Sequence, residues 1–169
     1  ADGTLRLTIK IKTDGQVSKA ARSLKAGDVV IISQAGGDFT HSLPKRNILL
    51  LSAGSGITPM MAMLQDWAGM AEPPQATLVH VCRAPDQFIF NAELQTLVQQ
   101  YPGLSVIPVY TAESGRLDAT RLQQLVPDFA LRDTLLCGPP SFMAWVADFY
   151  AEQSLSANLK QEHFQTRIT

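Results

Sequence analysis

The sequence predicts an α/β fold: a doubly wound, parallel, five-stranded sheet preceded by a partial antiparallel β-barrel segment. Two observations predict the sheet. From residue 47 onward, continuous aliphatic runs alternate with helical segments, and two of these runs end in glycine turns that open a helix. A third observation predicts the barrel segment. Residues 4–12, TLRLTIKIK, alternate strictly between apolar and polar side chains, as a half-buried antiparallel strand does.

Composition narrows the class of protein. The 169 residues are 46% hydrophobic and carry a formal net charge of −1, with charges of both signs scattered along the chain. No basic patch indicates nucleic acid or an anionic lipid surface as a partner, and no apolar run approaches the ~20 residues of a membrane span. The first residues lack the layout of a signal peptide, which favours a cytoplasmic protein.

The cysteines and histidines predict neither a disulfide framework nor a metal site. Only two cysteines, Cys82 and Cys137, and three histidines are present. They form no Cys-x-x-Cys pair and no iron–sulfur or zinc spacing. His80 and Cys82 share one face of an expected strand, but two ligands are too few for a zinc ion.

The first domain is expected over residues 1–43, as the C-terminal part of the barrel. Its first strand, 4–12, ends in a TDG turn, and a second strand is expected over 29–33, before two glycines. Nothing between these strands is long enough for a crossover helix, so this part differs from the parallel sheet that follows.

The second domain is expected over residues 44–169. Its aliphatic runs predict strands at 47–53, 76–83, 104–111, 133–138 and 158–164. Helices are expected at 59–70, at 91–101 with Asn91 as the N-cap, after Asp118, and at 141–154. Strands separated by helices in this way are typical of βαβ units.

The first glycine turn, SAGSGITP (52–59), lies where an expected buried strand ends. Gly54 permits a sharp turn, and Gly56 lacks the Cβ that would keep a ligand from the backbone. Thr58 is the expected cap of the next helix and Pro59 its first residue. The free amides of such a helix start favour an anion such as a pyrophosphate. The alternative is a tight strand–helix turn with a good cap.

The second turn, CGPPSFM (137–143), also follows an aliphatic run and opens a helix. Gly138 and Pro139 make it rigid and hold Cys137 at a strand's carboxyl end. Because the carboxyl ends of parallel strands meet at one edge of the sheet, both turns are expected to face one crevice. The alternative for Cys137 is a small buried hydrophobic residue.

These two motifs, in this order, resemble the ferredoxin–NADP reductase superfamily, whose nicotinamide domains carry G-x-G-x-T-P and then a C-G-P segment. The resemblance covers nearly the whole chain. Residues 15–39 are similar to the later half of the family's flavin-binding barrel, and residues 83–94 to the region after the second strand of its nucleotide domain. QEHF (161–164) is similar to the E-x-F ending of bacterial members.

The resemblance implies an FAD-dependent NAD(P)H oxidoreductase. Gly54 and Gly56 would face the pyrophosphate and ribose of NAD(P)H, and Thr58 its nicotinamide end. Cys137 would lie beside the carbon that donates hydride, with a positional and electrostatic role rather than a nucleophilic one. The other residues assigned to the nucleotide are Pro59, Arg83, Tyr110, Gly138, Pro139 and Met143, the last as a packing residue.

The resemblance also assigns residues to the flavin. Glu162 and Phe164 would lie near the flavin ring, Phe164 shielding it; the alternative for Phe164 is a core aromatic residue. Gly15, Val17 and Ser18 match a G-x-V-S element whose short helix would bind the FAD pyrophosphate, with Ser18 as its cap.

Two departures from the family pattern carry further expectations. Tyr110 and Thr111 stand where a Ser-Arg pair would bind the 2′-phosphate of NADP, which favours NADH. The R-x-Y-S strand that should precede residues 4–12 is missing, so the chain is expected to be a piece of a larger flavoprotein and inactive alone.

The implied electron acceptor is a ferredoxin-type iron–sulfur or haem partner, or a fused [2Fe–2S] domain. The alternative is a non-catalytic, nucleotide-binding electron-transfer subunit that docks on a partner enzyme.

Overall fold

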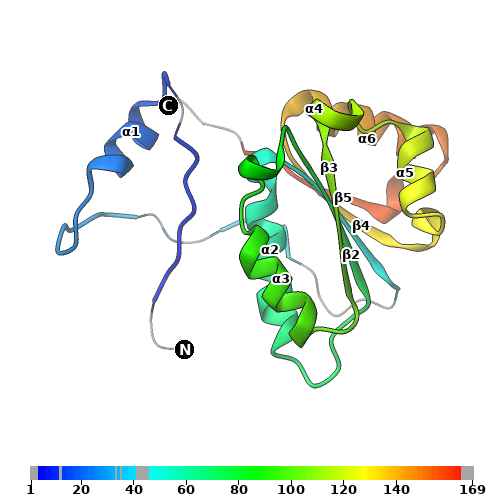
Figure 1. Ribbon diagram of the computed structural model, residues 1–169, viewed down its shortest axis with the longest axis horizontal. Coiled ribbons are helices and arrows are strands. Elements are labelled where there is room, and N and C mark those ends of the chain that lie inside the picture. The colour runs from blue at the N-terminus through cyan, green and yellow to red at the C-terminus, as the bar shows by residue number, and fades with distance from the viewer. Residues whose placement is uncertain (1–3, 12, 33, 35, 41–45, 165–169) are drawn as a thin grey trace. The chain divides into compact units, whose positions relative to one another are not determined.

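The computed structural model (Figure 1) describes residues 4–11, 13–32, 34, 36–40 and 46–164. The chain divides into two compact units, Ala1–Asp38 and Phe39–Thr169, and each is described by itself. The predicted domain boundary, between residues 43 and 44, lies outside the described residues. No described helix combines the length and the apolar character that crossing a lipid bilayer requires.

In the first unit, the described residues form one helix, α1, Gln16–Ser23, whose N-cap is Gly15. The prediction that Ser18 caps this helix was wrong. Ser18 lies inside the first turn, and its hydroxyl donates to the Gly15 carbonyl at 3.1 Å. No residue of α1 is buried, so packing contributes little to its stability.

The two antiparallel strands predicted in the first unit are absent from the described residues. Residues 4–11 and 29–32 are irregular. An alternating strand needs a paired strand on its edge and a cover for its apolar face, and no strand pairing is found among the described residues of these two segments. The apolar side chains of both segments are therefore exposed, namely Leu5, Leu7, Ile9, Ile11, Val29, Val30, Ile31 and Ile32.

The second unit confirms the predicted parallel sheet. Its five strands run in the order β3-β2-β1-β4-β5 and all pair in parallel. They are β1 Ile48–Ala53, β2 Ala76–Cys82, β3 Leu104–Tyr110, β4 Asp133–Cys137 and β5 Leu159–Glu162. The strand order reverses between β1 and β4, and ligands bind beyond the carboxyl ends of the strands at such a switch point.

Helices cover both faces of this sheet, as Figure 1 shows. Helices α2, Ile57–Ala68, and α3, Asn91–Gln100, pack on one face, whereas α5, Ala119–Leu125, and α6, Pro140–Glu152, pack on the other. A short helix, α4, Thr111–Ser114, follows β3. Every residue of β1 and β2 is buried, which explains why these strands read as continuous apolar runs rather than alternating ones.

The predicted N-cap is right for α5 and wrong for α3. Asp118 caps α5, as predicted, and its carboxylate accepts from the Arg121 amide at 2.8 Å. The prediction for Asn91 was wrong, because the N-cap of α3 is Phe90 in a left-handed conformation with φ 65°. The Asn91 side chain instead accepts from the Gln95 amide group at 3.4 Å.

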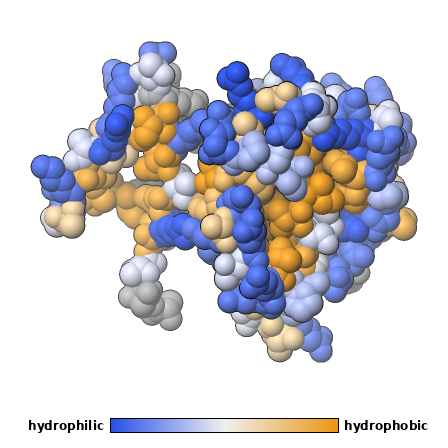
Figure 2. Space-filling model, viewed as in Figure 1, coloured by the Kyte–Doolittle hydropathy of each residue, from blue (hydrophilic) through white to orange (hydrophobic). Residues whose placement is uncertain are grey.

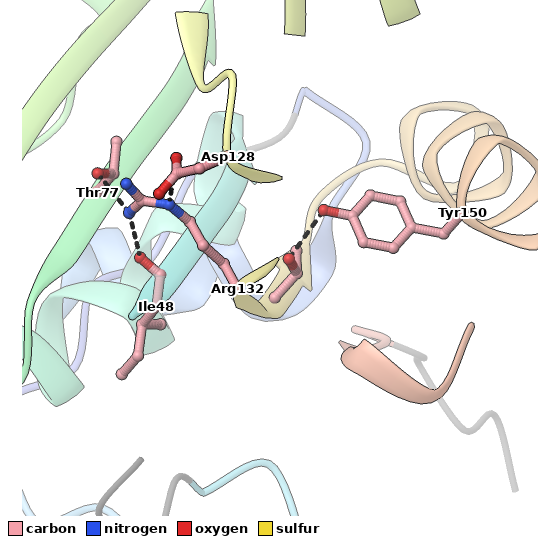
Figure 3. Close-up of polar contacts among 6 residues, drawn as sticks. Ile48, Thr77, Asp128, Arg132 and Tyr150 are labelled. Atoms are coloured by element: carbon pink, nitrogen blue, oxygen red, sulfur yellow. Dashed lines mark hydrogen bonds and ion pairs between the residues drawn. The ribbon is translucent and has the colours of Figure 1, made fainter. Parts of the chain in front are cut away.

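The amino ends of the strands are held by Arg132, just before β4 (Figure 3). One guanidinium nitrogen donates to the Thr77 hydroxyl at 2.9 Å and to the Ile48 carbonyl at 3.3 Å. Its Nε pairs with Asp128 at 2.8 Å. A single side chain thus links β1, β2 and the segment leading into β4, at the end of the sheet opposite the two glycine turns.

Candidate functional site

The two glycine turns are in direct contact at the carboxyl ends of β1 and β4. A Cβ placed on Gly56 would lie 2.1 Å from the Cys137 carbonyl oxygen, and one placed on Gly138 would lie 3.1 Å from the Ala53 Cβ. Gly56 thus lies where the backbone of the second turn passes, and Gly138 lies against Ala53 of the first turn and the Phe142 ring of its own turn. The predicted convergence of the two turns is confirmed, and it occurs at the switch point of the sheet.

The two glycines of the first turn have different roles. Gly56 is buried, and the missing Cβ leaves room for the backbone of Cys137 and Gly138. The prediction that it leaves room for a ligand was wrong for this reason. Gly54 has φ 54° and nothing within 4 Å of a Cβ placed on it. Open space for a ligand to reach the backbone is therefore found at Gly54.

Helix α2 begins earlier than predicted. Residues Gly54–Gly56 form a 3₁₀ turn that runs straight into α2, whose N-cap is Gly56. Thr58 consequently lies inside the helix, and its hydroxyl donates to the Ser55 carbonyl at 3.0 Å rather than capping an amide. Pro59 is the third helical residue, not the first. Its missing N–H is still tolerated, because the first-turn amides have no partner within the helix.

Cys137 is fully buried at the end of β4. Burial raises the pKa of its thiol to about 12, and the nearby charge of Glu162 acts in the same direction. The thiol is therefore neutral at physiological pH, which excludes a thiolate nucleophile in this structure. Glu162 is the neighbour of Cys137 across the β4–β5 pairing and is half-buried.

Phe164 follows β5 and is 56% exposed. The alternative that it is a core aromatic residue was therefore wrong for this structure. An exposed aromatic ring just beyond the strand that carries Glu162 is free to cover a planar ligand.

Sequence reasoning missed a buried polar pair beside this site. Ser52, in β1, and His80, in β2, are both fully buried, and the Ser52 hydroxyl lies 2.8 Å from His80 Nδ1. The imidazole stacks on Phe88, with ring centroids 4.9 Å apart. The other ring nitrogen, Nε2, has no hydrogen-bond partner among the described residues. The signal in the sequence was a lone histidine in the middle of an apolar run.

His80 makes the stability of the protein depend on pH. Burial lowers its pKa to about 4, against the opposing effect of the hydrogen bond with Ser52. The unfolded chain takes up this proton near pH 6.5, so the free energy of unfolding should fall as the pH drops from about 6.5 to about 4. We expect a loss of ~3 kcal/mol from this residue. Urea unfolding at pH 7 and pH 4 measures it; an equal pH dependence in His80→Phe would contradict it.

The remaining predicted nucleotide residues are spread around the turns. Arg83 is exposed after β2, and its carbonyl accepts from the Ala112 amide at 3.0 Å. Tyr110 is half-buried at the end of β3, and burial raises the pKa of its hydroxyl. Pro139 is exposed in the second turn. Met143 is buried in the core on the α5–α6 face, as its interpretation as a packing residue predicted.

The residues assigned to FAD, Gly15, Val17 and Ser18, lie in the first unit at the start of α1. Val17 is 81% exposed. Their assignment to the flavin pyrophosphate stays a prediction.

One hollow of the second unit lies away from the two turns. It has a volume of about 580 Å³ between α3 and β3 and is lined by uncharged side chains, including Asn91, Gln95, Gln99, Val106 and Pro108. Figure 2 shows apolar side chains in this region. Size alone does not identify the site, because the strand topology places the switch point at β1 and β4 instead.

The fold and the paired turns define a dinucleotide-binding α/β domain, and comparison with known proteins gives its family. Residues 50–148, more than half of the chain, match the model of the oxidoreductase NAD-binding domain. The chain belongs to this family, the nucleotide-binding domain of the ferredoxin–NADP reductase superfamily.

Curated relatives match along most of the chain. An NADPH oxidoreductase of Mycobacterium tuberculosis is 31% identical over the whole chain, and the NADH oxidoreductase HCR of Escherichia coli is 31% identical over 95% of it. The chain spans 46% and 50% of these two relatives, respectively. It therefore corresponds to about half the length of the curated proteins that it matches.

Solved structures share the fold. A flavohemoglobin from Malassezia yamatoensis with bound FAD and heme superposes with a TM-score of 0.81 at 23% identity, over 93% of this chain and 43% of that one. The FAD/NAD-binding domain of a nitric oxide dioxygenase from Vibrio cholerae superposes with a TM-score of 0.67 at 28% identity, over 76% of this chain and 55% of that one.

Proposed function

We propose that this chain is the nucleotide-binding part of an FAD-dependent NAD(P)H oxidoreductase, which passes hydride from nicotinamide to FAD and then electrons to an iron–sulfur or haem partner. The observation that carries the proposal is the contact between the two turns, Gly56 on Cys137 and Gly138 on Ala53. A buried thiol, an open glycine and a helix start meet there at the switch point of a parallel sheet.

The residues at this place fit a nicotinamide nucleotide. Gly54 offers backbone that a pyrophosphate can approach, since no described atom lies within 4 Å of a Cβ placed there. The first turn of α2, a helix of 12 residues, supplies the positive end of a helix dipole. When bound, the nicotinamide supplies a hydride and the flavin accepts it.

The chain's own residues position this chemistry. Cys137 presents a neutral thiol, which can lie against a nicotinamide ring without attacking it. Its place is fixed by the Gly56 contact, so the ring that it touches is oriented too. Glu162, one strand further, places a carboxylate beside the thiol, and Phe164 offers an exposed aromatic surface for the flavin.

The names of the relatives support the proposed partners. One relative, 30% identical over 97% of the chain, is the ferredoxin reductase component of a 3-ketosteroid-9-alpha-monooxygenase of Mycobacterium tuberculosis. Another is flavohemoprotein A of Dictyostelium discoideum. A ferredoxin-type or haem acceptor follows by analogy. We place the protein in the cytoplasm, where nicotinamide nucleotides are available to it.

Anaerobic mixing of the flavin-loaded holoenzyme with NADH tests the proposal. Bleaching of the flavin absorbance within the stopped-flow time range is the expected result. An unbleached flavin, with NADH bound, would instead support a non-catalytic nucleotide-binding subunit.

NADH should serve this protein at least as well as NADPH. Tyr110 lines the end of β3 with a half-buried phenol, and Arg116 is exposed beyond α4. Neither presents the paired hydroxyl and guanidinium that bind a 2′-phosphate. Flavin reduction rates with both nucleotides measure the preference. A tenfold or larger preference for NADPH, about 1.4 kcal/mol of transition-state discrimination, would contradict it.

The 169-residue chain by itself should bind FAD weakly. The described part of the first unit exposes its apolar side chains, and α1 has no buried residue. Ligand pockets normally enclose ~70–90% of a ligand's surface, which this unit does not do alone. Purified protein should therefore be colourless after gel filtration. A yellow preparation with about one flavin per chain would show that another copy completes the pocket.

A further inference from the structure

A row of side chains crosses the sheet near the carboxyl ends of its strands. The strand register pairs Glu162 with Cys137, Cys137 with Ser52, and Ser52 with His80. Residues paired in register on neighbouring parallel strands point to the same face, ~4.8 Å apart. The Ser52–His80 pair therefore lies directly beside Cys137, on the face that α2 and α3 cover.

Ser52 also leads directly into the contact between the two turns. Ala53, the next residue, packs against Gly138, and Gly54 begins the first turn. A hydrogen bond that fixes the Ser52 side chain to β2 thus fixes the last residues of β1. Those residues are the ones on which the second turn rests.

The pair is not the best choice for stability alone. Both residues are fully buried, and burial keeps His80 neutral, with one proton for two nitrogens. Only Nδ1 has a partner, and Nε2 has none in the described part of the chain. A half-satisfied buried polar group is less favourable than a well-packed apolar one. What the pair does provide is a directional link between β1 and β2 at the site.

We propose that Ser52 and His80 are positioning residues: their hydrogen bond holds the end of β1 in the register that places the first turn and Cys137 for hydride transfer. The expected effect on the rate of flavin reduction rests on the proposed function, whereas the expected effect on the geometry of the two turns does not. Neither side chain belongs to the residues proposed to bind the nucleotide, so both would act through the first turn and Cys137.

The double variant Ser52→Ala/His80→Phe tests the proposal. Phenylalanine keeps a ring that can stack on Phe88, and removing both partners of the hydrogen bond together leaves neither polar group unpaired. We expect a melting temperature equal to or above that of the wild type, with flavin reduction at saturating NADH slower by about tenfold and KM changed less than threefold. A merely structural pair would show the reverse, a lower melting temperature and an unchanged rate.

A matched control exists in the same sheet. Thr134, in β4, and Tyr150, in α6, form a second buried hydroxyl pair at 2.8 Å, away from the turns (Figure 3). Thr134→Val/Tyr150→Phe should leave the reduction rate within twofold of the wild type. Ser52→Thr, which keeps the hydroxyl, should restore most of the rate lost in Ser52→Ala. A folded Ser52–His80 double variant that reduces flavin within twofold of the wild type would overturn the proposal.

The amide resonances of Gly54, Gly56 and Gly138 test the geometry without any nucleotide. They should shift more in the Ser52–His80 double variant, or in Ser52→Ala if the double variant does not fold, than in the control variant. Equal shifts in both would overturn the proposal. If the wild-type holoenzyme fails to reduce its flavin, the proposed function is wrong, and these resonances alone decide whether the pair positions the turn.

Discussion

Gly56→Ala should destabilise the protein by at least about 3 kcal/mol, one of the larger effects available to a single methyl group. The added Cβ would lie 2.1 Å from the Cys137 carbonyl oxygen and 2.7 Å from the Gly138 amide nitrogen. Both are backbone atoms held in β4 and its turn, so they cannot move away without separating the two strands. Urea unfolding measured by circular dichroism gives the difference.

Gly54→Ala is the matched control. Its Cβ would meet nothing within 4 Å, and the only cost is the left-handed backbone at φ 54°, which disfavours alanine by about 1 kcal/mol. If both variants lose the same stability, the two turns do not pack on each other as the structure shows.

Cys137→Ala should slow flavin reduction in the holoenzyme by a factor on the order of 10 to 100, with little change in nucleotide affinity. The thiol is neutral, so its proposed contribution is not nucleophilic attack but the placement of the ring at the moment when donor and acceptor align. Anaerobic stopped-flow traces over a range of NADH concentrations separate the limiting rate from the apparent affinity.

Cys82→Ala is the control for this variant. Cys82 is also a buried free cysteine, at the end of β2, but β1 lies between β2 and β4 in the sheet. Its replacement should leave the limiting rate unchanged. Equal rates for Cys137→Ala and the wild type would reduce Cys137 to a packing residue.

The strands could be predicted from the sequence because burial on both faces leaves a continuous signal. Residues 48–53 are all buried in β1, and the sequence there is uninterrupted by charge. The strands expected in the first unit could not be judged in this way. An alternating pattern indicates which face of a strand is apolar. It does not indicate whether neighbouring strands and a covering layer are available to bury that face.

Local rules predicted helix starts only where the side chain had no competing partner. Asp118 caps α5, whereas Thr58 donates to Ser55 and Asn91 accepts from Gln95. At α2 and α3 the backbone enters the helix one or two residues early, through a 3₁₀ turn or a left-handed residue. At α1, where the prediction of Ser18 also failed, Gly15 is the N-cap. Such entries depend on the neighbouring backbone rather than on the capping residue.

The meeting of the two turns was predicted from the sequence, but its details were not. The glycine spacing indicated both turns, yet a missing Cβ does not reveal whether a ligand or another turn fills the space, and at Gly56 it is the turn after Cys137. The Ser52–His80 pair joins residues 28 apart in sequence. Only the strand register brings them together, so no local pattern could have found it.

The central claim is that a nicotinamide nucleotide binds where the two turns meet. Its most direct test is a titration of the ¹⁵N-labelled chain with NADH, followed by the backbone amide resonances. Saturable shifts are expected at Gly54, Gly56, Gly138 and Glu162, around the contact between the two turns. Shifts confined to the hollow between α3 and β3, at Asn91, Gln95 and Gln99, or no saturable shifts at all, would contradict nucleotide binding at the two turns.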